Sequence, residues 1–259
     1  MVLLSFDIEE FDLPFEYNQA IDMSEQIRIS EQGLERILQV LEQEGVRATF
    51  YSTVVFMERL RGGIRERLLS AGHEIASHGI SHSSFSPADY TTSRRRLQEL
   101  TGQRISGFRM ARMQPIDHEA QRDAGYTYDS SLHPTYLPGR YNHWDKPRKP
   151  YQEPNGLWTL PASVVPGIRF PLFWLSMHNL PEWLYLRLMS FTAKRDHYLN
   201  TYYHPWEFAD LKALPYQLPF YIVRNSGEAL QGRLLRLIRH LKAQGLIFGT
   251  TQEYLSSRQ

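Results

Sequence analysis

Two histidines four residues apart are the first residues of this chain that could do chemistry. The segment from residue 72 to residue 82 reads GHEIASHGISH, and its apolar run ends at Ala76, just before His78 and His82. If the backbone turns helically there, positions i and i+4 lie on one face and both imidazoles can reach one ion. Borderline-soft divalent metals such as zinc accept imidazole readily. Because this spacing also occurs by chance, a metal site needs a third ligand.

Carboxylates near the N-terminus offer one. Residues 2–6 (VLLSF) predict a short buried strand, and Asp7, Glu9, Glu10 and Asp12 follow it directly. Four carboxylates in six residues repel one another unless a positive charge sits among them. They form either a solvated acidic loop or a strand end from which Asp7 and Glu9 point toward a cation.

Strands and helices alternate along the chain, which is typical of a parallel sheet or barrel. Polar residues follow several of the strands, including Arg109 and Arg112, Asp129 and His204. Barrels of this class place their active sites at the C-terminal ends of the strands, so we expect one site assembled there. Expected strands cover residues 2–6, 47–51, 73–76, 105–108, 126–128, 157–160, 197–203 and 246–249. Expected helices cover residues 30–45 (capped by Ser30), 64–71, 87–100, 116–124, 182–191 and 228–244, with a last short helix capped by Thr251.

Composition excludes several classes of protein. The 259 residues, 42% hydrophobic and 22% charged, can bury a sizeable core in one α/β barrel or two small domains. A formal net charge of +1 argues against broad electrostatic capture of nucleic acid. With no cysteine, any metal must be held by nitrogen and oxygen. No secretory signal or membrane-spanning segment is visible, which predicts a cytoplasmic protein.

Two segments interrupt the alternation. The stretch at about residues 133–171 contains eight prolines and one short strand candidate, and it predicts a long decorated loop of the kind that is usually functional or disordered. His143 and Trp144 within it line a sugar-binding rim or pack on the barrel surface. Residues 170–191, rich in Leu, Phe and Trp, predict a buried barrel helix, with a lid or membrane-facing role as the alternative.

Taken in order, these motifs resemble those of the NodB-homology polysaccharide deacetylases, carbohydrate esterase family 4. SFDIEE resembles the first motif, SHGISH the second, GFR at residues 107–109 the third, YDSS at residues 128–131 the segment after the fifth strand, and YHPWEF at residues 203–208 the fifth motif. The runs YDSS, DKPRKPY and HPWEF are similar to the subfamily encoded beside exopolysaccharide genes. The resemblance covers nearly the whole length and implies one domain, residues 1–259, folded as a distorted TIM-like (β/α)7 barrel.

The chain departs from the common family pattern in three places. Ile8 separates two acids that are usually adjacent, and the second acid is a Glu instead of an Asp. The third motif continues with Met110, Ala111 and Arg112 where Ala-Pro or Pro-Pro is usual. The subfamily's glycine-rich segment before the long helix is replaced by PLFWLS, residues 171–176. The first departure bears on metal affinity and the last on the substrate rim.

The resemblance implies a divalent metal ion held by Glu9, His78 and His82. Two imidazoles and one carboxylate leave open positions on the ion, as a hydrolytic site requires. Zinc is the simplest choice, and cobalt, nickel and iron(II) suit the same ligands. Such an ion polarises the carbonyl of an N-acyl group and acidifies its bound water.

The resemblance also implies the proton-transfer groups. Asp7 is the general base, paired with and oriented by Arg109. His204 is the general acid that protonates the departing amine. Asp129 is expected to orient or tune His204.

The expected reaction is hydrolysis of an N-acetyl group from an amino sugar of a poly- or oligosaccharide, with release of acetate. Two alternatives stay open. The same residues can hydrolyse other C–N bonds, such as a formamide on a lipid-linked sugar or a small amide. In that case we also expect the protein to contact a membrane or a lipid-linked substrate. A degenerate barrel can instead hold sugar without cutting it. The expected partner is a carbohydrate that bears an N-acyl amino sugar, with no nucleic acid.

Overall fold

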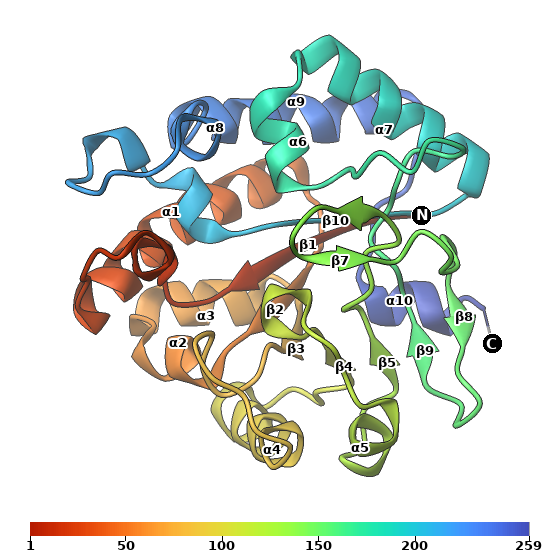
Figure 1. Cartoon of the computed structure of the whole chain (residues 1–259), viewed down its shortest axis with the longest axis horizontal. Helices are drawn as coiled ribbons and strands as arrows, with labels where there is room; N and C mark the ends of the chain where they lie inside the picture. The colour runs from red at the N-terminus through yellow and green to blue at the C-terminus, as the bar shows by residue number, and fades with distance from the viewer. Residues whose placement is uncertain (259) are drawn as a thin grey trace.

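A single curled sheet forms the centre of the molecule (Figure 1). The computed structural model describes residues 1–258. The strands lie in the order β10-β1-β2-β3-β4-β5-β9-β8, and the pairs are parallel except for β8 with β9. Their bounds are β1 (Val2–Ile8), β2 (Thr49–Ser52), β3 (Glu74–Ser77), β4 (Gly107–Phe108), β5 (Tyr128–Asp129), β8 (Tyr151–Gln152), β9 (Trp158–Thr159) and β10 (Leu199–Tyr203).

The predicted fold class is confirmed: the chain is a single-domain α/β protein whose sheet curls into a half-barrel, as a distorted (β/α)7 barrel requires. The segment after β9 is joined to β10, because Ser163 N donates to Asn200 O over 2.7 Å and Asn200 N donates to Ser163 Oγ over 2.9 Å. The strand expected at residues 246–249 is reduced to one isolated bridge, between Phe248 and Val2.

Helices cover the outer side of the sheet (Figure 1). Their bounds are α1 (Met23–Glu44), α2 (Val54–Arg59), α3 (Gly62–Ser70), α4 (Asp89–Thr101), α5 (His118–Asp123), α6 (Trp174–Asn179), α7 (Glu182–Asp196), α8 (Phe220–Val223), α9 (Glu228–Ala243) and α10 (Thr251–Ser256). Short 3-10 helices occur at η1 (Leu13–Tyr17), η2 (Ala111–Met113), η3 (Pro205–Phe208) and η4 (Leu211–Ala213). Within residues 1–258 no helix is both long enough and apolar enough to cross a membrane.

The N-terminal caps of two helices differ from the predicted capping residues. Helix α1 begins at Met23, because Asp22 accepts the N–H of Glu25 over 2.9 Å and caps it. Ser30, the expected cap, is buried inside the helix. Helix α10 is capped by Thr250, one residue before the expected cap. In both cases a second capping residue lies nearby, and the tertiary packing selects between them.

The two segments that interrupt the alternation are more ordered than the sequence suggests. The proline-rich stretch contains an antiparallel hairpin of β6 (Tyr136–Leu137) and β7 (Tyr141–Asn142), besides β8 and β9. The expected buried barrel helix is half-buried: α7 packs one face on β10 and α9, while Trp183 is 66% and Phe191 50% exposed. Helix α7 also extends to Asp196, beyond the predicted end.

Gly33 sets the distance between α1 and η3. A Cβ atom at this position would lie 1.7 Å from the carbonyl oxygen of Pro205. The glycine weakens the helix intrinsically, by about 1 kcal/mol relative to alanine, but it lets α1 pack directly on the backbone of η3. Because η3 follows His204, this contact fixes the end of β10.

We expect Gly33→Ala to lower the free energy of unfolding by about 3 kcal/mol, because the added methyl group meets rigid backbone. Thermal and urea denaturation followed by circular dichroism measure this. Gly63→Ala is the matched control, since a Cβ atom there meets nothing within 4 Å, and it should be neutral or stabilising by up to about 1 kcal/mol. Equal stability of the two variants would contradict the close packing of α1 on η3.

Candidate active site

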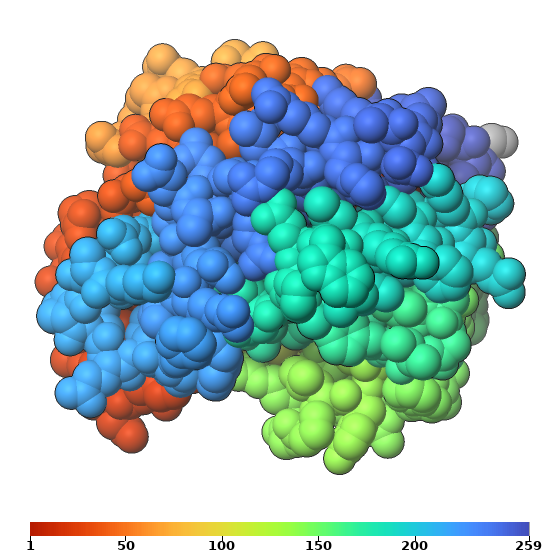
Figure 2. Space-filling model, turned by 90° about the horizontal axis from the view of Figure 1, so that it is seen from above, coloured from red at the N-terminus to blue at the C-terminus, as the bar shows by residue number. Residues whose placement is uncertain are grey.

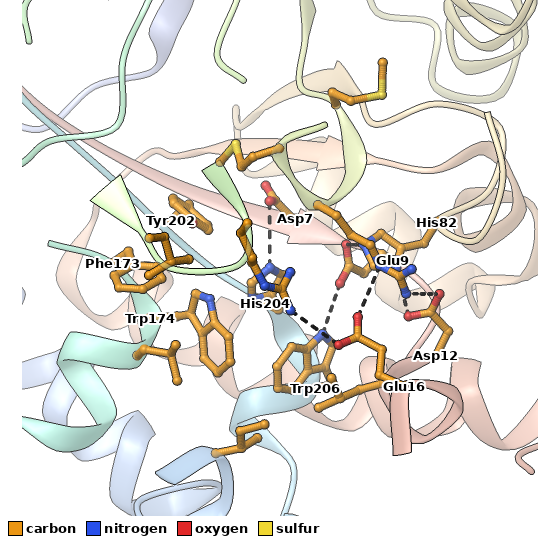
Figure 3. A pocket seen from close by; sticks show the side chains of 18 of the residues that line it. Asp7, Glu9, Asp12, Glu16, His82, Phe173, Trp174, Tyr202, His204 and Trp206 are labelled. Carbon is orange, nitrogen blue, oxygen red and sulfur yellow. Dashed lines mark hydrogen bonds and ion pairs between the residues drawn. The ribbon is translucent and has the colours of Figure 1, made fainter. Parts of the chain in front are cut away.

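A pocket of about 290 Å3 opens at the carboxyl ends of the parallel strands (Figure 3). Asp7 lies in β1 and Glu9 just after it, His78 follows β3, and His204 follows β10. Three segments line its mouth: residues 12–17, residues 137–141 and residues 221–222. Figure 2 shows the molecular outline indented between the red N-terminal segment and the green segment near residue 140. The register of the parallel sheet therefore brings distant polar residues together.

Glu9, His78 and His82 form a cluster with the geometry of a metal site. Glu9 Oε2 lies 3.1 Å from His78 Nε2 and 3.2 Å from His82 Nε2. One ligand atom from each residue lies within 4.8 Å of the others. Tetrahedral zinc with bonds of about 2.0–2.1 Å separates its ligands by roughly 3.3 Å. The three residues therefore fit a divalent cation, and among residues 1–258 this is the one such cluster found.

The two imidazoles are held with Nε2 toward the cluster. His78 Nδ1 lies 2.8 Å from the carbonyl oxygen of Arg109, and His82 Nδ1 lies 2.9 Å from Asp12 Oδ1. Hydrogen bonds of this kind fix the tautomer and orientation of metal-binding histidines. Asp12 stood out in the sequence only as one of four acids, and the structure gives it this supporting position.

The charge of Glu9 is stabilised from several sides. Burial alone would raise its pKa, but His82, His204 and a hydrogen bond from His78 outweigh burial and hold the pKa far below its usual value. Trp206 Nε1 also donates to Glu9 Oε1 over 3.1 Å. The carboxylate is therefore ionised and available as a ligand. The indole contact could not be predicted from the sequence motifs.

Asp7 is paired with a fully buried arginine. Arg109 Nη1 donates to Asp7 Oδ1 over 2.6 Å, and Arg109 Nε donates to the carbonyl oxygen of Ser130 over 3.0 Å. Burial alone would lower the pKa of Arg109, but Asp7 and neighbouring groups raise it, so the guanidinium stays charged. The second oxygen of Asp7, Oδ2, lies 3.9 Å from His204 Nε2. One oxygen is thus fixed and the other faces the pocket.

His204 is strongly biased toward its protonated form. Its Nδ1 lies 2.8 Å from Glu207 Oε1, and Glu207 Oε2 lies 2.9 Å from Nε2 of the buried His178. Burial alone would lower the pKa of His204, but the charges of Glu9, Glu207 and Asp7 together raise it to about 9. The imidazole also stacks on Trp206, with ring centroids 5.0 Å apart. At neutral pH the ring can therefore carry a proton on Nε2.

The expected contact of Asp129 with His204 is not observed. Asp129 Oδ1 accepts from Gln121 Nε2 over 2.9 Å and from Ser131 Oγ over 2.6 Å, and Asp129 does not line the pocket. Asp129 Oδ2 accepts the backbone N–H of Ser131 over 2.8 Å, so both of its oxygens have partners other than His204. Glu207, three residues after His204 in η3, takes the orienting position, and the HPWE run could have indicated it.

The unusual third motif has a structural consequence. Arg112 and Met113 both adopt positive φ, 56° and 52°, which costs about 1–3 kcal/mol for each non-glycine residue. This conformation turns Arg112 toward the pocket, where its Nη2 donates to Asp12 Oδ2 over 2.9 Å. The residues that depart from the family pattern thus support Asp12 and, through it, His82.

The sugar-rim residues of the sequence analysis lie outside this pocket. His143 lines a neighbouring pocket, and Trp144 is half exposed beneath the guanidinium of Arg169, 5.8 Å from its ring centroid. The aromatic wall of the candidate site is formed by Phe173, Trp174, Tyr202 and Trp206 instead.

Comparison with known proteins agrees with this geometry. The family model described as polysaccharide deacetylase matches residues 2–128. Residues 2–128 are therefore similar to the polysaccharide deacetylase family. This part of the chain contains the Glu9–His78–His82 cluster, Asp7 and Arg109. No curated protein sequence matches the chain.

Solved structures of polysaccharide deacetylases share the fold. A "probable polysaccharide deacetylase" from Pseudomonas aeruginosa PAO1 matches with a TM-score of 0.62 and 16% identity, over 97% of this chain and 89% of that chain. The Bc1960 peptidoglycan N-acetylglucosamine deacetylase matches with 0.53 and 15%, over 97% and 86%. A CE4 family pseudoenzyme from Bacillus anthracis matches with 0.53 and 14%, over 98% and 64%. The chain spans about two thirds of the length of that pseudoenzyme.

We expect Glu207→Gln to lower the pKa of His204 from about 9, by an amount on the order of 1–3 units, because a hydrogen-bonded negative charge is removed. NMR titration of the His204 ring in metal-free protein measures this. Glu58→Gln removes a surface carboxylate that pairs with Arg96 and serves as the control. An unchanged His204 pKa in the Glu207 variant would show that Glu207 does not set its protonation.

Proposed function

We propose that this protein is a metal-dependent hydrolase that removes N-acetyl groups from amino sugars of a poly- or oligosaccharide. The observation that carries the proposal is the convergence of a metal-type cluster, an arginine-paired carboxylate and a protonated imidazole on one pocket. The family match over residues 2–128 supports it. In this proposal the whole chain, residues 1–259, is one deacetylase domain.

Glu9, His78 and His82 would hold the divalent cation. Zinc fits the ligand set best, and cobalt, nickel or iron(II) suit it as well. When bound, the cation supplies a Lewis acid that polarises the acyl carbonyl and acidifies water. Asp12 and the carbonyl of Arg109 keep the two imidazoles turned toward it.

Asp7 acts as the general base. Its Oδ1 is fixed by Arg109, so Oδ2 is the oxygen that takes a proton from the attacking water. Arg109 is thus a positioning residue for the base.

His204 acts as the general acid. It holds a proton at Nε2, which faces the pocket, and gives it to the departing amine nitrogen. Because the negative charge of Glu9 contributes to the raised pKa of His204, a cation on Glu9 would offset that charge and bring the pKa closer to neutral. An acid with a pKa nearer the working pH releases its proton more readily.

The aromatic wall is suited to a sugar. Trp174 meets both His204 and Trp206 edge-on, with ring centroids 5.6 and 5.4 Å apart. Aromatic faces pack on the C–H groups of a pyranose, and their bulk excludes water from the acid. The acyl sugar would therefore lie against Trp174 with its nitrogen toward His204.

The finer features expected from the sequence are part of the same proposal. The runs YDSS, DKPRKPY and HPWEF support membership of the exopolysaccharide-associated subfamily. A pseudoenzyme among the structural neighbours supports the rival possibility, in which the barrel holds sugar without cutting it.

Metal-free protein should bind one zinc ion per chain in isothermal titration calorimetry. His82→Ala should abolish stoichiometric binding, and Asp12→Asn should weaken it by about 10–100-fold through loss of imidazole orientation. His240→Ala, a change on the outer helix α9, is the control and should leave binding intact. Absence of binding in the unmodified protein would refute metal dependence.

Asp7→Asn should lower acetate release from an N-acetylated chito-oligosaccharide by about 10²–10⁴-fold, because the amide cannot accept a proton. Zinc stoichiometry should stay at one, and Asp123→Asn at the exposed end of α5 should leave turnover unchanged. Formate or ammonia release from other substrates in place of acetate would favour the deformylase or amidase alternative. Zinc binding with no turnover of any acyl substrate would favour the binding module.

A further inference from the structure

A second pocket adjoins the candidate active site. Its volume is about 640 Å3, and it shares Arg112, Met113, Arg140 and Tyr141 with the first pocket. A molecule whose acyl group lies at Asp7 can therefore extend across the shared residues into the second pocket. Nothing in the proposed chemistry uses this space.

The first pocket is the more acidic of the two, although Arg112 and Arg140 line both pockets. Four carboxylates line the first: Asp7, Glu9, Asp12 and Glu16. The second is lined by three cationic side chains, those of Arg112, Arg140 and Lys146, and by one carboxylate, that of Glu153.

The carboxylate of Glu153 in the second pocket already has partners within the protein. Glu153 accepts the hydroxyl of Thr159 over 2.8 Å and lies 3.5 Å from His118 Nδ1. The cations are paired in part, and Arg112 also donates to Asp12 Oδ2 over 2.9 Å. Glu16 is a single carboxylate that lies 3.3 Å from the guanidinium of Arg112 and 3.4 Å from that of Arg140.

Further hydrogen-bonding atoms in this pocket have no partner. Lys146 is exposed and forms no ion pair with the residues that the structure describes. His118 Nε2 and His143 Nδ1 lack a hydrogen-bond partner within residues 1–258. The ammonium group of Lys146 is a donor in every state in which it is charged, and it favours a ligand that supplies acceptor oxygens.

A stacked pair of aromatic rings lines the second pocket. His143 stacks on Tyr141, with ring centroids 4.9 Å apart and an interplanar angle of 8°. Such a platform suits a second ring that follows the amino sugar. The cations at its margin then face the substituents of that ring.

We propose that the second pocket binds an anionic group of the substrate, a carboxylate or a phosphate, attached next to the N-acyl amino sugar. This inference rests on the proposed function, because it names the substrate class of the same site. The anion is supplied either by a uronic acid that neighbours the amino sugar or by a glycosyl phosphate. A neutral glycan would leave Lys146 without an acceptor and Arg140 with only the carboxylate it shares with Arg112, and so would bind less tightly.

The test is ligand binding by calorimetry with metal-free protein, in which no turnover occurs. Three ligands are compared: N-acetylglucosamine 1-phosphate, a glucuronate–N-acetylglucosamine disaccharide, and neutral diacetylchitobiose. We expect one of the two anionic ligands to bind at least about tenfold tighter than the neutral one at low salt, with the preference falling as salt rises. The preferred ligand identifies the source of the anion.

Lys146→Gln should weaken the preferred anionic ligand by roughly three- to tenfold and leave diacetylchitobiose unchanged. Arg140→Gln, at a residue that lines both pockets, should weaken the anionic ligand more than diacetylchitobiose. Lys149→Gln is the matched control, because Lys149 is exposed and does not line either pocket. Equal affinity for all three ligands, or an equal loss in the Lys149 variant, would overturn the proposal. Since binding is read without turnover, a preference for anions without acetate release would refute only the hydrolase.

Discussion

The buried guanidinium of Arg109 is the interaction on which the rest of the site depends. It binds Asp7 at the end of β1 and Ser130 after β5, and its carbon lies 3.9 Å from the ring centroid of Tyr51 in β2. Its own carbonyl oxygen orients His78 after β3. A buried charge without partners is very costly, so these contacts are required together. The side chain and the carbonyl group of this one residue therefore tie four strands into a single arrangement.

The sequence was sufficient for those parts of the site that follow from strand order. Polar residues directly after successive parallel strands must meet at one edge of the sheet, and the structure places Glu9, His78 and His82 together for this reason. The sequence was insufficient to predict the partner of Asp129, because the position of this residue at a strand end does not show which neighbour its side chain contacts. The carboxylate that contacts His204 comes from within three residues, at Glu207.

Local patterns likewise predicted the fold only where they agreed with packing. The helix expected from Ser30 starts a full two turns earlier, since Ile27 is buried and Asp22 supplies a cap. Gly33 reads as a weak point in a helix, yet its missing side chain is what admits the backbone of η3. The apolar run at residues 246–249 predicts a strand, but it reaches β1 through one bridge only. Such choices depend on distant contacts that no local pattern contains.

Glu9 connects the two histidines of the candidate metal site with His204. Its carboxylate lies within 3.2 Å of Nε2 of both cluster histidines, and its charge also contributes to the raised pKa of His204. A divalent cation bound to Glu9 would neutralise this negative charge, because the cation is the larger local charge. Ligand histidines must be neutral to bind it, so loading would release protons from the cluster. Cation binding would also lower the pKa of His204. In the proposed mechanism, cation binding and proton release by His204 would therefore be coupled through one carboxylate.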